Sequence, residues 1–475
     1  MLEDVFQPPS SRVLAGAARA DISPPDGIHC RCWGASPHDT ASSLHHPLTA
    51  TALALRAEAG GPPLVLLGLD LSSFEPAENR RFLVAVRDAA DLAADHLLVN
   101  LCHTHAAPTL AFDLANRPGG DRIFTYFQEV VDRSIEIIRD AVSALRPGWI
   151  TAEYGRCALA SNRNYVDAAF GETLCGFNPH VPADDTLAYA RIVGDDGATV
   201  ASVLNYGCHP TSLGPMNTAM SPDYIAEARR VVEEADGGPC LFLIGPCGDT
   251  APRNTYASDP SEADRNGRQL GHAAASVAAS LLPPGKEMFY TGPLISGATL
   301  ATWAQRDMRQ DSYTKVRTSR LKLDLPLRAK EGIATLEGRH RQWLDRREEA
   351  ERHGDDLGVQ NAEAMLERSR RAMTREPELP EGDTLHFEAW IWQLGRIVVV
   401  GLPAEPFSQL QVALRKRFPS LCIVVAMNTN GTCGYLMPET DFGRGLYQEW
   451  ISPTGPGSFE TLLTALETQI MAWNP

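Results

Sequence analysis

The chain has 475 residues, of which 44% are hydrophobic and 21% charged, and its formal net charge is −16 at pH 7. This composition is ordinary for a globular enzyme and too apolar for a disordered chain. The deficit of basic residues argues against a nucleic-acid partner and against an anionic membrane surface, because both require concentrated Lys and Arg.

Short apolar, β-branched runs predict strands that are buried on both faces, and amphipathic stretches between them predict helices. In chain order these elements are strand 64–71, helix 78–94, strand 96–101, helix 124–145, strand 198–206, helix 224–235, strand 240–244, helix 266–282, strand 397–402 and strand 421–426. The alternation predicts an α/β fold with a layered sheet core flanked by helices.

A change of composition marks residues 331–375, which are rich in Arg, Glu, Ala and Leu and contain Gly354 near the middle. This predicts an exposed, charged helix pair inserted on the core, followed by a short linker over 376–383. Such an insertion is typical of either a lid or a contact in a homo-oligomer. With no repeat and no Pro/Ser-rich linker, we expect one domain over residues 12–475, ending in an amphipathic helix over 459–473.

Targeting signals are not apparent in the sequence. No apolar run approaches the about 18 residues of a membrane span, and the opening MLEDVFQPPS lacks the basic-then-apolar order of a secretory signal. Ten cysteines are too sparse for a disulfide scaffold. We therefore expect a cytoplasmic protein with no membrane span.

Ionisable residues follow most of the predicted strands directly. Ligands of α/β proteins gather beyond the carboxyl ends of strands, where loops present polar groups over a rigid platform. The residues in such positions are Asp70, His103, His105, His209, Asp249, Glu405 and Tyr435. We expect them to form one site.

His103 and His105 are two residues apart, so in an extended segment both rings point to the same side. Imidazole is the commonest metal ligand, and a catalytic zinc takes three protein ligands with N or O donors. His103, His209 and Glu405 would supply such a set, and a metal would offset the cost of burying the carboxylate. The alternative for each histidine is a hydrogen-bonded residue of the core or the surface.

Other catalytic motifs are absent from the sequence: it has no H-E-x-x-H, no G-x-S-x-G, no Walker loop and no dinucleotide fingerprint after the first strand. Cys102 and Cys208 each precede a candidate histidine, so we expect them to face the other way and pack in the core.

Seven segments, taken in order, are similar to one known family. They are AGAARADISPP from Ala15, CHTHAAP from Cys102, SNRNYV from Ser161, GCHPTSLGP from Gly207, GPCGDTAPRN from Gly245, LPAEPF from Leu402 and CGYLMPETDFGRGLYQEW from Cys433. In this series the chain resembles the neutral, non-lysosomal ceramidases, zinc amidases that cut the amide of N-acylsphingosine. The resemblance extends from near residue 15 to near residue 450.

The resemblance implies a role for each matching residue. His103, His209, Glu405 and Tyr435 would bind Zn²⁺, while His105, Arg163 and Tyr447 would surround the scissile carbonyl. Asp223 and Asp249 also match the family, and we expect them to fix loops. Asp70 is expected to be a turn residue at the end of its strand.

These observations predict a zinc-dependent amidohydrolase that uses metal-activated water to cleave a carboxamide. An acidic chain with no apparent signal, and with no immunoglobulin-like C-terminal domain expected, favours a small-molecule substrate, an N-acyl amine or a small cyclic amide, over ceramide. The alternatives are a zinc-dependent esterase or lactonase, since the same groups act on esters, and a non-catalytic metal- or ligand-binding protein.

Overall fold

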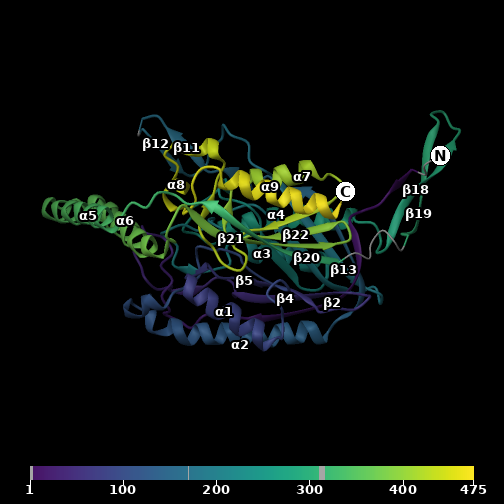
Figure 1. Cartoon of the computed structure of the whole chain (residues 1–475), viewed down its shortest axis with the longest axis horizontal. Helices are drawn as coiled ribbons and strands as arrows, with labels where there is room; N and C mark the ends of the chain where they lie inside the picture. Colours follow the sequence, from purple (N-terminus) through teal and green to yellow (C-terminus); the bar gives the residue numbers. More distant parts are fainter. Residues whose placement is uncertain (1–3, 170, 310–315, 475) are drawn as a thin grey trace.

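Two β-sheets packed face to face form the centre of the molecule (Figure 1). The structure is a computed structural model that describes residues 4–169, 171–309 and 316–474. Within these residues, the larger sheet has the strand order β16 (Cys240–Ile244), β14 (Thr199–Tyr206), β13 (Thr186–Gly194), β9 (Arg146–Arg156), β2 (Ser10–Asp21), β4 (Thr49–Ala57), β5 (Leu64–Leu69) and β7 (Leu97–Leu101). The smaller sheet has the order β20 (Val316–Pro326), β21 (Thr384–Leu394), β22 (Ile397–Gly401) and β24 (Cys422–Ala426).

The strands predicted from apolar runs are the buried ones. Every residue of β5, β7, β16, β22 and β24 is buried. One face of each sheet packs against the other sheet, where Trp390 and Trp392 of β21 lie among the side chains of the larger sheet. The other face of each sheet is covered by helices, so these strands are continuously hydrophobic rather than alternating.

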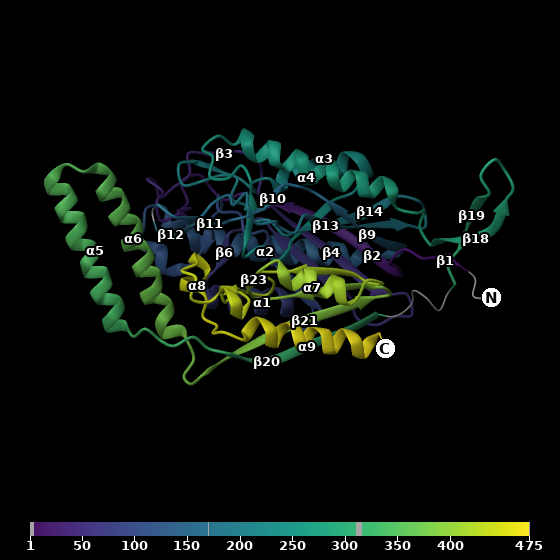
Figure 2. The same cartoon turned by 90° about the horizontal axis from the view of Figure 1, so that it is seen from above.

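Helices cover both sides of the two-sheet core (Figure 2). Helices α1 (Pro76–Ala89) and α2 (Ile123–Ser143) pack on one half of the larger sheet, and α3 (Ile225–Asp236) and α4 (Ser261–Ser280) on the other half. The smaller sheet is covered by α7 (Gln409–Arg417) and α9 (Ser458–Trp473). The predicted layered α/β fold with flanking helices is confirmed.

Short elements connect these layers. They are β1 (Val5–Phe6), β3 (Ser43–Leu44), β6 (Ser73–Phe74), β8 (Thr109–Leu110), η1 (Phe112–Asn116), η2 (Gly120–Arg122), β10 (Ala160–Asn162), β11 (Asn164–Asp167), β12 (Glu172–Cys175), β15 (Ala219–Met220), β17 (Thr250–Pro252), η4 (Glu376–Glu378), β23 (Glu405–Pro406), β25 (Tyr435–Leu436), η5 (Glu439–Asp441) and α8 (Tyr447–Ile451). Among the described residues, no helix combines the length and the apolar character that crossing a membrane requires.

The edge strands β7 and β16 of the larger sheet are linked through one buried side chain. Asn100 of β7 accepts a hydrogen bond from the backbone N–H of Ile244 at the end of β16, at 3.2 Å. Its amide nitrogen donates to the carbonyl of Met427, just after β24, at 2.6 Å. The carboxyl ends of β7, β16 and β24 are therefore held together, and the loops that follow them lie side by side.

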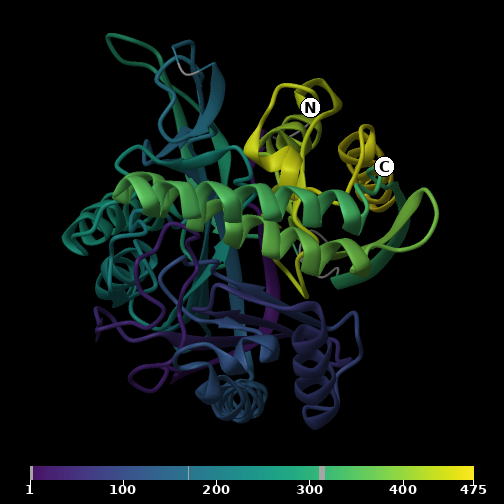
Figure 3. The same cartoon turned by 90° about the vertical axis from the view of Figure 1, so that its left-hand side faces the viewer.

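Two hairpins project from opposite ends of the molecule (Figures 1 and 2). One is the strand pair β18 (Lys286–Leu294) and β19 (Leu300–Asp307). The other is the predicted helix pair, α5 (Ile333–His353) and α6 (Asp356–Arg375), which turns at Gly354 with φ +66°. Figure 3 shows α5 and α6 running across one end of the molecule.

Candidate metal centre

Three loops bring two histidines and a carboxylate together. His103 follows β7, His209 follows β14, and Glu405 lies in the short strand β23 just after β22. The Nε2 atoms of His103 and His209 lie 3.4 Å and 3.3 Å from the same Glu405 oxygen, Oε2. Four ligands at about 2.0–2.1 Å from a tetrahedral zinc ion lie roughly 3.3–3.4 Å from one another, so these separations match a zinc site.

The other ring nitrogen of each histidine is fixed by the backbone. The Nδ1 atom of His103 donates to the carbonyl of Ser72 at 3.0 Å, and that of His209 donates to the carbonyl of Cys247 at 2.9 Å. With the proton on Nδ1, the Nε2 lone pair of each ring points at Glu405, which is the usual arrangement of metal-binding histidines. His103 adopts φ +65°, an unusual conformation for a residue with a side chain.

Several buried polar atoms of this cluster have no hydrogen-bond partner among the described residues. They include Nε2 of His209, Nε2 of His105 and Oε2 of Glu405. A buried polar atom without a partner costs roughly 1–3 kcal/mol. A metal ion would satisfy these atoms together, so the donor set fits a bound cation.

The electrostatics of Glu405 and His209 also suit a metal, whereas at His103 burial is outweighed by Glu405, which raises the pKa of this histidine. Burial alone would raise the pKa of Glu405, but the neighbouring His103 and His209 outweigh it and hold this pKa well below its ordinary value. Burial and the charge of Arg163 lower the pKa of His209 to about 4. An ionised carboxylate and a neutral imidazole are the forms that bind a metal.

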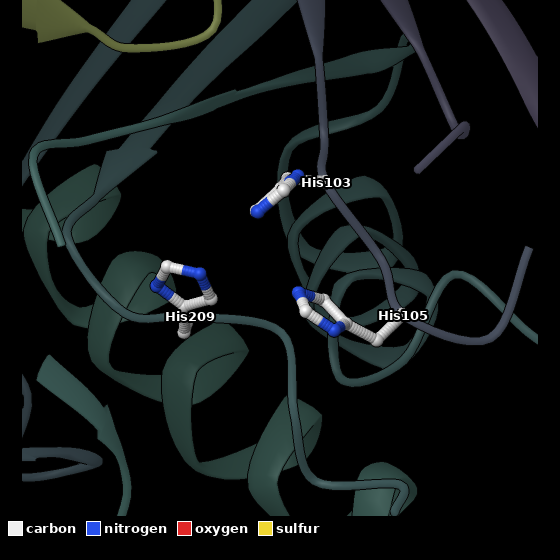
Figure 4. A group of neighbouring side chains, drawn as sticks. All are labelled: His103, His105 and His209. Atoms are coloured by element: carbon white, nitrogen blue, oxygen red, sulfur yellow. The ribbon is translucent and has the colours of Figure 1, made fainter. Parts of the chain in front are cut away.

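His105 is the third histidine of the cluster, and Figure 4 shows the three side chains pointing toward one another. Its ring centroid lies 4.9 Å from that of His103 and 5.6 Å from that of His209. The ligand atoms of the three rings lie within 4.8 Å of one another. Burial, with the charges of the other two histidines, lowers the pKa of His105 well below its ordinary value.

Tyr435, Arg163 and Tyr447 surround this cluster. Strand β23 pairs in parallel with β25, which places Glu405 beside Tyr435. The Arg163 guanidinium donates from Nε and Nη2 to the carbonyl of Gly248, at 3.0 and 2.7 Å, and lies 5.4 Å from the Tyr435 ring. The Tyr447 ring lies 6.0 Å from that of Tyr435 and is 38% exposed. The structure thus brings the expected metal ligands and the residues expected around the carbonyl into one region: His103, His209, Glu405, Tyr435, His105, Arg163 and Tyr447.

Comparisons with known proteins find similar structures but no similar sequence among family models or curated proteins. No protein-family model and no curated protein matches the chain. Its structure is similar to that of a neutral ceramidase from Pseudomonas aeruginosa, with a TM-score of 0.63 and 16% identity over 98% of this chain and 75% of that one. The chain has the neutral ceramidase fold. A ceramidase complexed with C2 matches at a TM-score of 0.64 and 14% identity, over 98% of this chain and 76% of that one.

Two carboxylates hold the loops of this ceramidase fold in place, as the sequence predicts. Asp249 accepts hydrogen bonds from the backbone N–H and the hydroxyl of Ser408, at 2.6 and 2.8 Å, and so fixes the segment just after Glu405. Asp223 accepts from the N–H groups of Leu213 and Tyr224, at 3.0 and 2.7 Å. It thereby ties the loop after His209 to the start of α3.

Asp70 follows directly after β5, as expected, and it has a further partner. It is more than a turn residue, because its two oxygens accept from the Arg229 guanidinium at 3.0 and 2.6 Å in the buried interior. Thr49 adds two further hydrogen bonds, from its N–H and its hydroxyl. The Asp70–Arg229 pair anchors α3 to the end of β5.

Cys102 and Cys208 are buried in the core, as predicted.

Two features beside the site were not recognised in the sequence. A small cavity with space of about 10 Å³, room for roughly one water molecule, adjoins His105. It is lined mainly by small and polar residues, together with Trp33, whose ring lies 4.8 Å from that of His105. Separately, the Nε2 atoms of His45 and His46 lie 3.2 and 2.9 Å from Oδ1 of Asp264, in a second group with metal-binding atoms. The main site was predicted from ionisable residues that directly follow predicted strands. Neither His45 nor His46 follows one, so this criterion did not identify them.

Proposed function

We propose that this chain is a metal-dependent hydrolase of a carboxamide, with a zinc ion held by His103, His209, Glu405 and Tyr435. The observation that carries the proposal is the convergence of His209 Nε2 and Glu405 Oε2, both buried and without hydrogen bonds among the described residues. The ceramidase fold supports the choice of an amide, since the solved structures it matches are ceramidases.

When bound, the zinc ion would polarise the amide carbonyl and supply an activated water at neutral pH. The chain's own residues transfer a proton and stabilise the negative charge on the carbonyl oxygen. Nε2 of His105 has no hydrogen-bond partner among the described residues, so this atom takes a proton from the attacking water and delivers it to the leaving amine. Arg163 and Tyr447 donate toward the carbonyl oxygen, where negative charge develops during attack.

The substrate in this proposal is a small amide. The cavity beside His105 has space of about 10 Å³, room for roughly one water molecule, and is far smaller than ligand pockets of roughly 300–1,000 Å³. His38, Ser36, Asn217 and Thr218 contribute polar groups to its lining. A two-chain lipid would require a larger and more apolar space.

A matched substrate panel tests the proposal. Purified protein, loaded with zinc, would be assayed on an N-acyl amine, the ester with the same acyl group, a lactam, a lactone and ceramide in detergent. We expect the N-acyl amine or the lactam to be cleaved, and chelation to abolish the activity. Faster cleavage of the ester or lactone would make the enzyme an esterase, and faster cleavage of ceramide would overturn the small substrate. No cleavage of any member would overturn the catalytic function.

A further inference from the structure

Helix α6 packs against the segments that surround the metal centre. Arg371 donates from Nη1 to the carbonyl of Cys32, at 3.1 Å, and Cys32 lines the cavity beside His105. The Arg368 guanidinium lies 3.5 Å from the centre of the Trp450 ring, in the same short helix as Tyr447. Helix α6 therefore contacts both the segment of Cys32 and the short helix that carries Tyr447.

Tyr447 connects α6 to the metal centre. On the inner side, its phenol interacts electrostatically with Arg163 and Glu405. On the outer side, it interacts with Arg368 and Arg375 of α6. Tyr447 is 38% exposed and interacts with charged groups of both regions.

Three arginines of α6 differ in whether their side chains form an ion pair. Arg368, Arg371 and Arg375 are spaced by three and four residues, so they lie along one side of the helix. Arg371 is paired with Glu367 at 2.8 Å. In the described part of the chain, the side chains of Arg368 and Arg375 have no hydrogen bond and no ion pair, although Arg368 lies over the Trp450 ring. Two of these three guanidinium groups therefore lack an anionic partner in direct contact.

Leaving these two cations unpaired is unfavourable. Burial, together with the charges of neighbouring arginines, lowers the pKa of both Arg368 and Arg375. Glu75 attracts Arg375, although no ion pair joins them. A bound anion would offset the cost of partly burying two guanidinium groups.

We propose that Arg368 and Arg375 bind a carboxylate carried by the substrate, so that the natural substrate is an anionic amide. This inference rests on the proposed hydrolase function. The planar guanidinium matches a carboxylate, and stacking on Trp450 fixes the orientation of Arg368. The chain as a whole carries a net charge of −16 and repels anions, so selecting one requires local positive charge of this kind.

The interaction of Tyr447 with both arginines relates the two groups of the substrate. If Tyr447 donates to the scissile carbonyl, we expect the carboxylate to lie close to the amide within the same small molecule. Two simple chemistries satisfy this: an N-acyl amino acid, with the acid on the amine side, and a monoamide of a dicarboxylic acid, with the acid on the acyl side.

Binding tests the subsite without turnover. In the zinc-loaded His105→Ala variant, N-butyrylglycine and its neutral counterpart N-butyrylglycinamide would be titrated by calorimetry, and N-methylglutaramic acid would test the acyl-side carboxylate. We expect one of the two acids to bind more tightly than the neutral amide. Arg368→Gln or Arg375→Gln should raise the dissociation constant of that acid by about tenfold to a hundredfold. Arg346→Gln is the matched control, because Arg346 also stacks on a tryptophan, Trp343, but lies in α5. Equal binding of acid and neutral amide, or equal loss in the control, would overturn the subsite.

Turnover then distinguishes the two proposals. In enzyme that retains His105, we compare kcat/KM for the preferred acid with kcat/KM for the neutral amide. Arg375→Gln should lower this ratio by about the factor by which it weakens binding of the acid. An unchanged ratio in an active enzyme would overturn the carboxylate subsite and leave the hydrolase function standing. If no amide were cleaved, the hydrolase function would fail, and the calorimetric result would still decide whether the arginines bind a carboxylate.

Discussion

The Nε2 atom of His209 lies 3.3 Å from Oε2 of Glu405, and neither atom has a hydrogen bond within the described residues. Glu405 is held on one side by its pairing with Tyr435 and on the other by the Asp249–Ser408 hydrogen bonds. His209 is held by the hydrogen bond from its Nδ1 to the carbonyl of Cys247. Both residues are thus positioned by the protein itself, which favours tight binding of a metal.

His209→Ala should lose the metal. The substitution removes one of the three closest ligands, and we expect zinc content measured by atomic spectroscopy to fall from about one ion per chain to a small fraction of that. His45→Ala, in the second histidine group, is the control that separates the two sites. If wild-type protein carried no zinc after reconstitution, or if His209→Ala kept it, the proposed site would be wrong.

His105→Ala should retain the metal and lose turnover. Its proposed role is proton transfer, whose loss typically lowers kcat by about a hundredfold to ten-thousandfold. Zinc content and amide hydrolysis would be measured on the same preparation. Metal loss equal to that of His209→Ala would instead assign His105 as a ligand, which the grouping of the three rings within 4.8 Å allows.

Arg163→Lys should lower kcat by about a hundredfold to a thousandfold at constant zinc content. A lysine cannot reproduce the two hydrogen bonds that orient the guanidinium on Gly248 and direct its remaining nitrogen. Arg156→Lys, an exposed arginine paired with Asp185, is the matched substitution. Similar activities for the two variants would contradict a role for Arg163 at the carbonyl.

Asp70→Asn should destabilise the fold by about 3–5 kcal/mol, because it leaves the buried Arg229 guanidinium without its counter-charge. Urea unfolding followed by circular dichroism would measure the change. Asp195→Asn breaks an exposed pair with Arg12 and is expected to cost about 1 kcal/mol or less. A comparable loss in the two variants would show that the buried pair is not anchoring α3.

Glu367→Gln should have a pH-dependent effect on stability. Burial opposes ionisation of this carboxyl, but hydrogen bonds from Arg370 and Arg371 outweigh it and lower the pKa of Glu367 to about 2. Because this pKa is below its ordinary value of 4.5, the stabilisation is fully present above pH 4.5 and is lost as the pH falls toward 2. The stability difference between wild type and Glu367→Gln should therefore shrink across that range. The exposed Glu363→Gln serves as the control, and a constant difference across the range would contradict the ion pairing.

The sequence determined the buried strands and the residues that follow them. Strands β5, β7, β14, β16, β22 and β24 were predictable because each is a continuous apolar run that ends abruptly at polar residues. Strands such as β4 and β20 were not recognised. Ala and Thr are frequent in β4, and apolar residues alternate with Lys and Asp in β20, so neither forms a distinctive run.

Only the tertiary structure decided which strand ends meet. Apolar runs specify burial, but they do not specify the partner of an edge strand, and here the buried Asn100 joins β7 to β16 and to the end of β24. The orientation of Arg163 depends on a carbonyl far away in the sequence. The unpaired arginines of α6 are likewise ordinary surface charges in the sequence. They become significant because the helix folds back against Cys32 and Trp450, which partly removes water from cations whose side chains form no ion pair among the described residues.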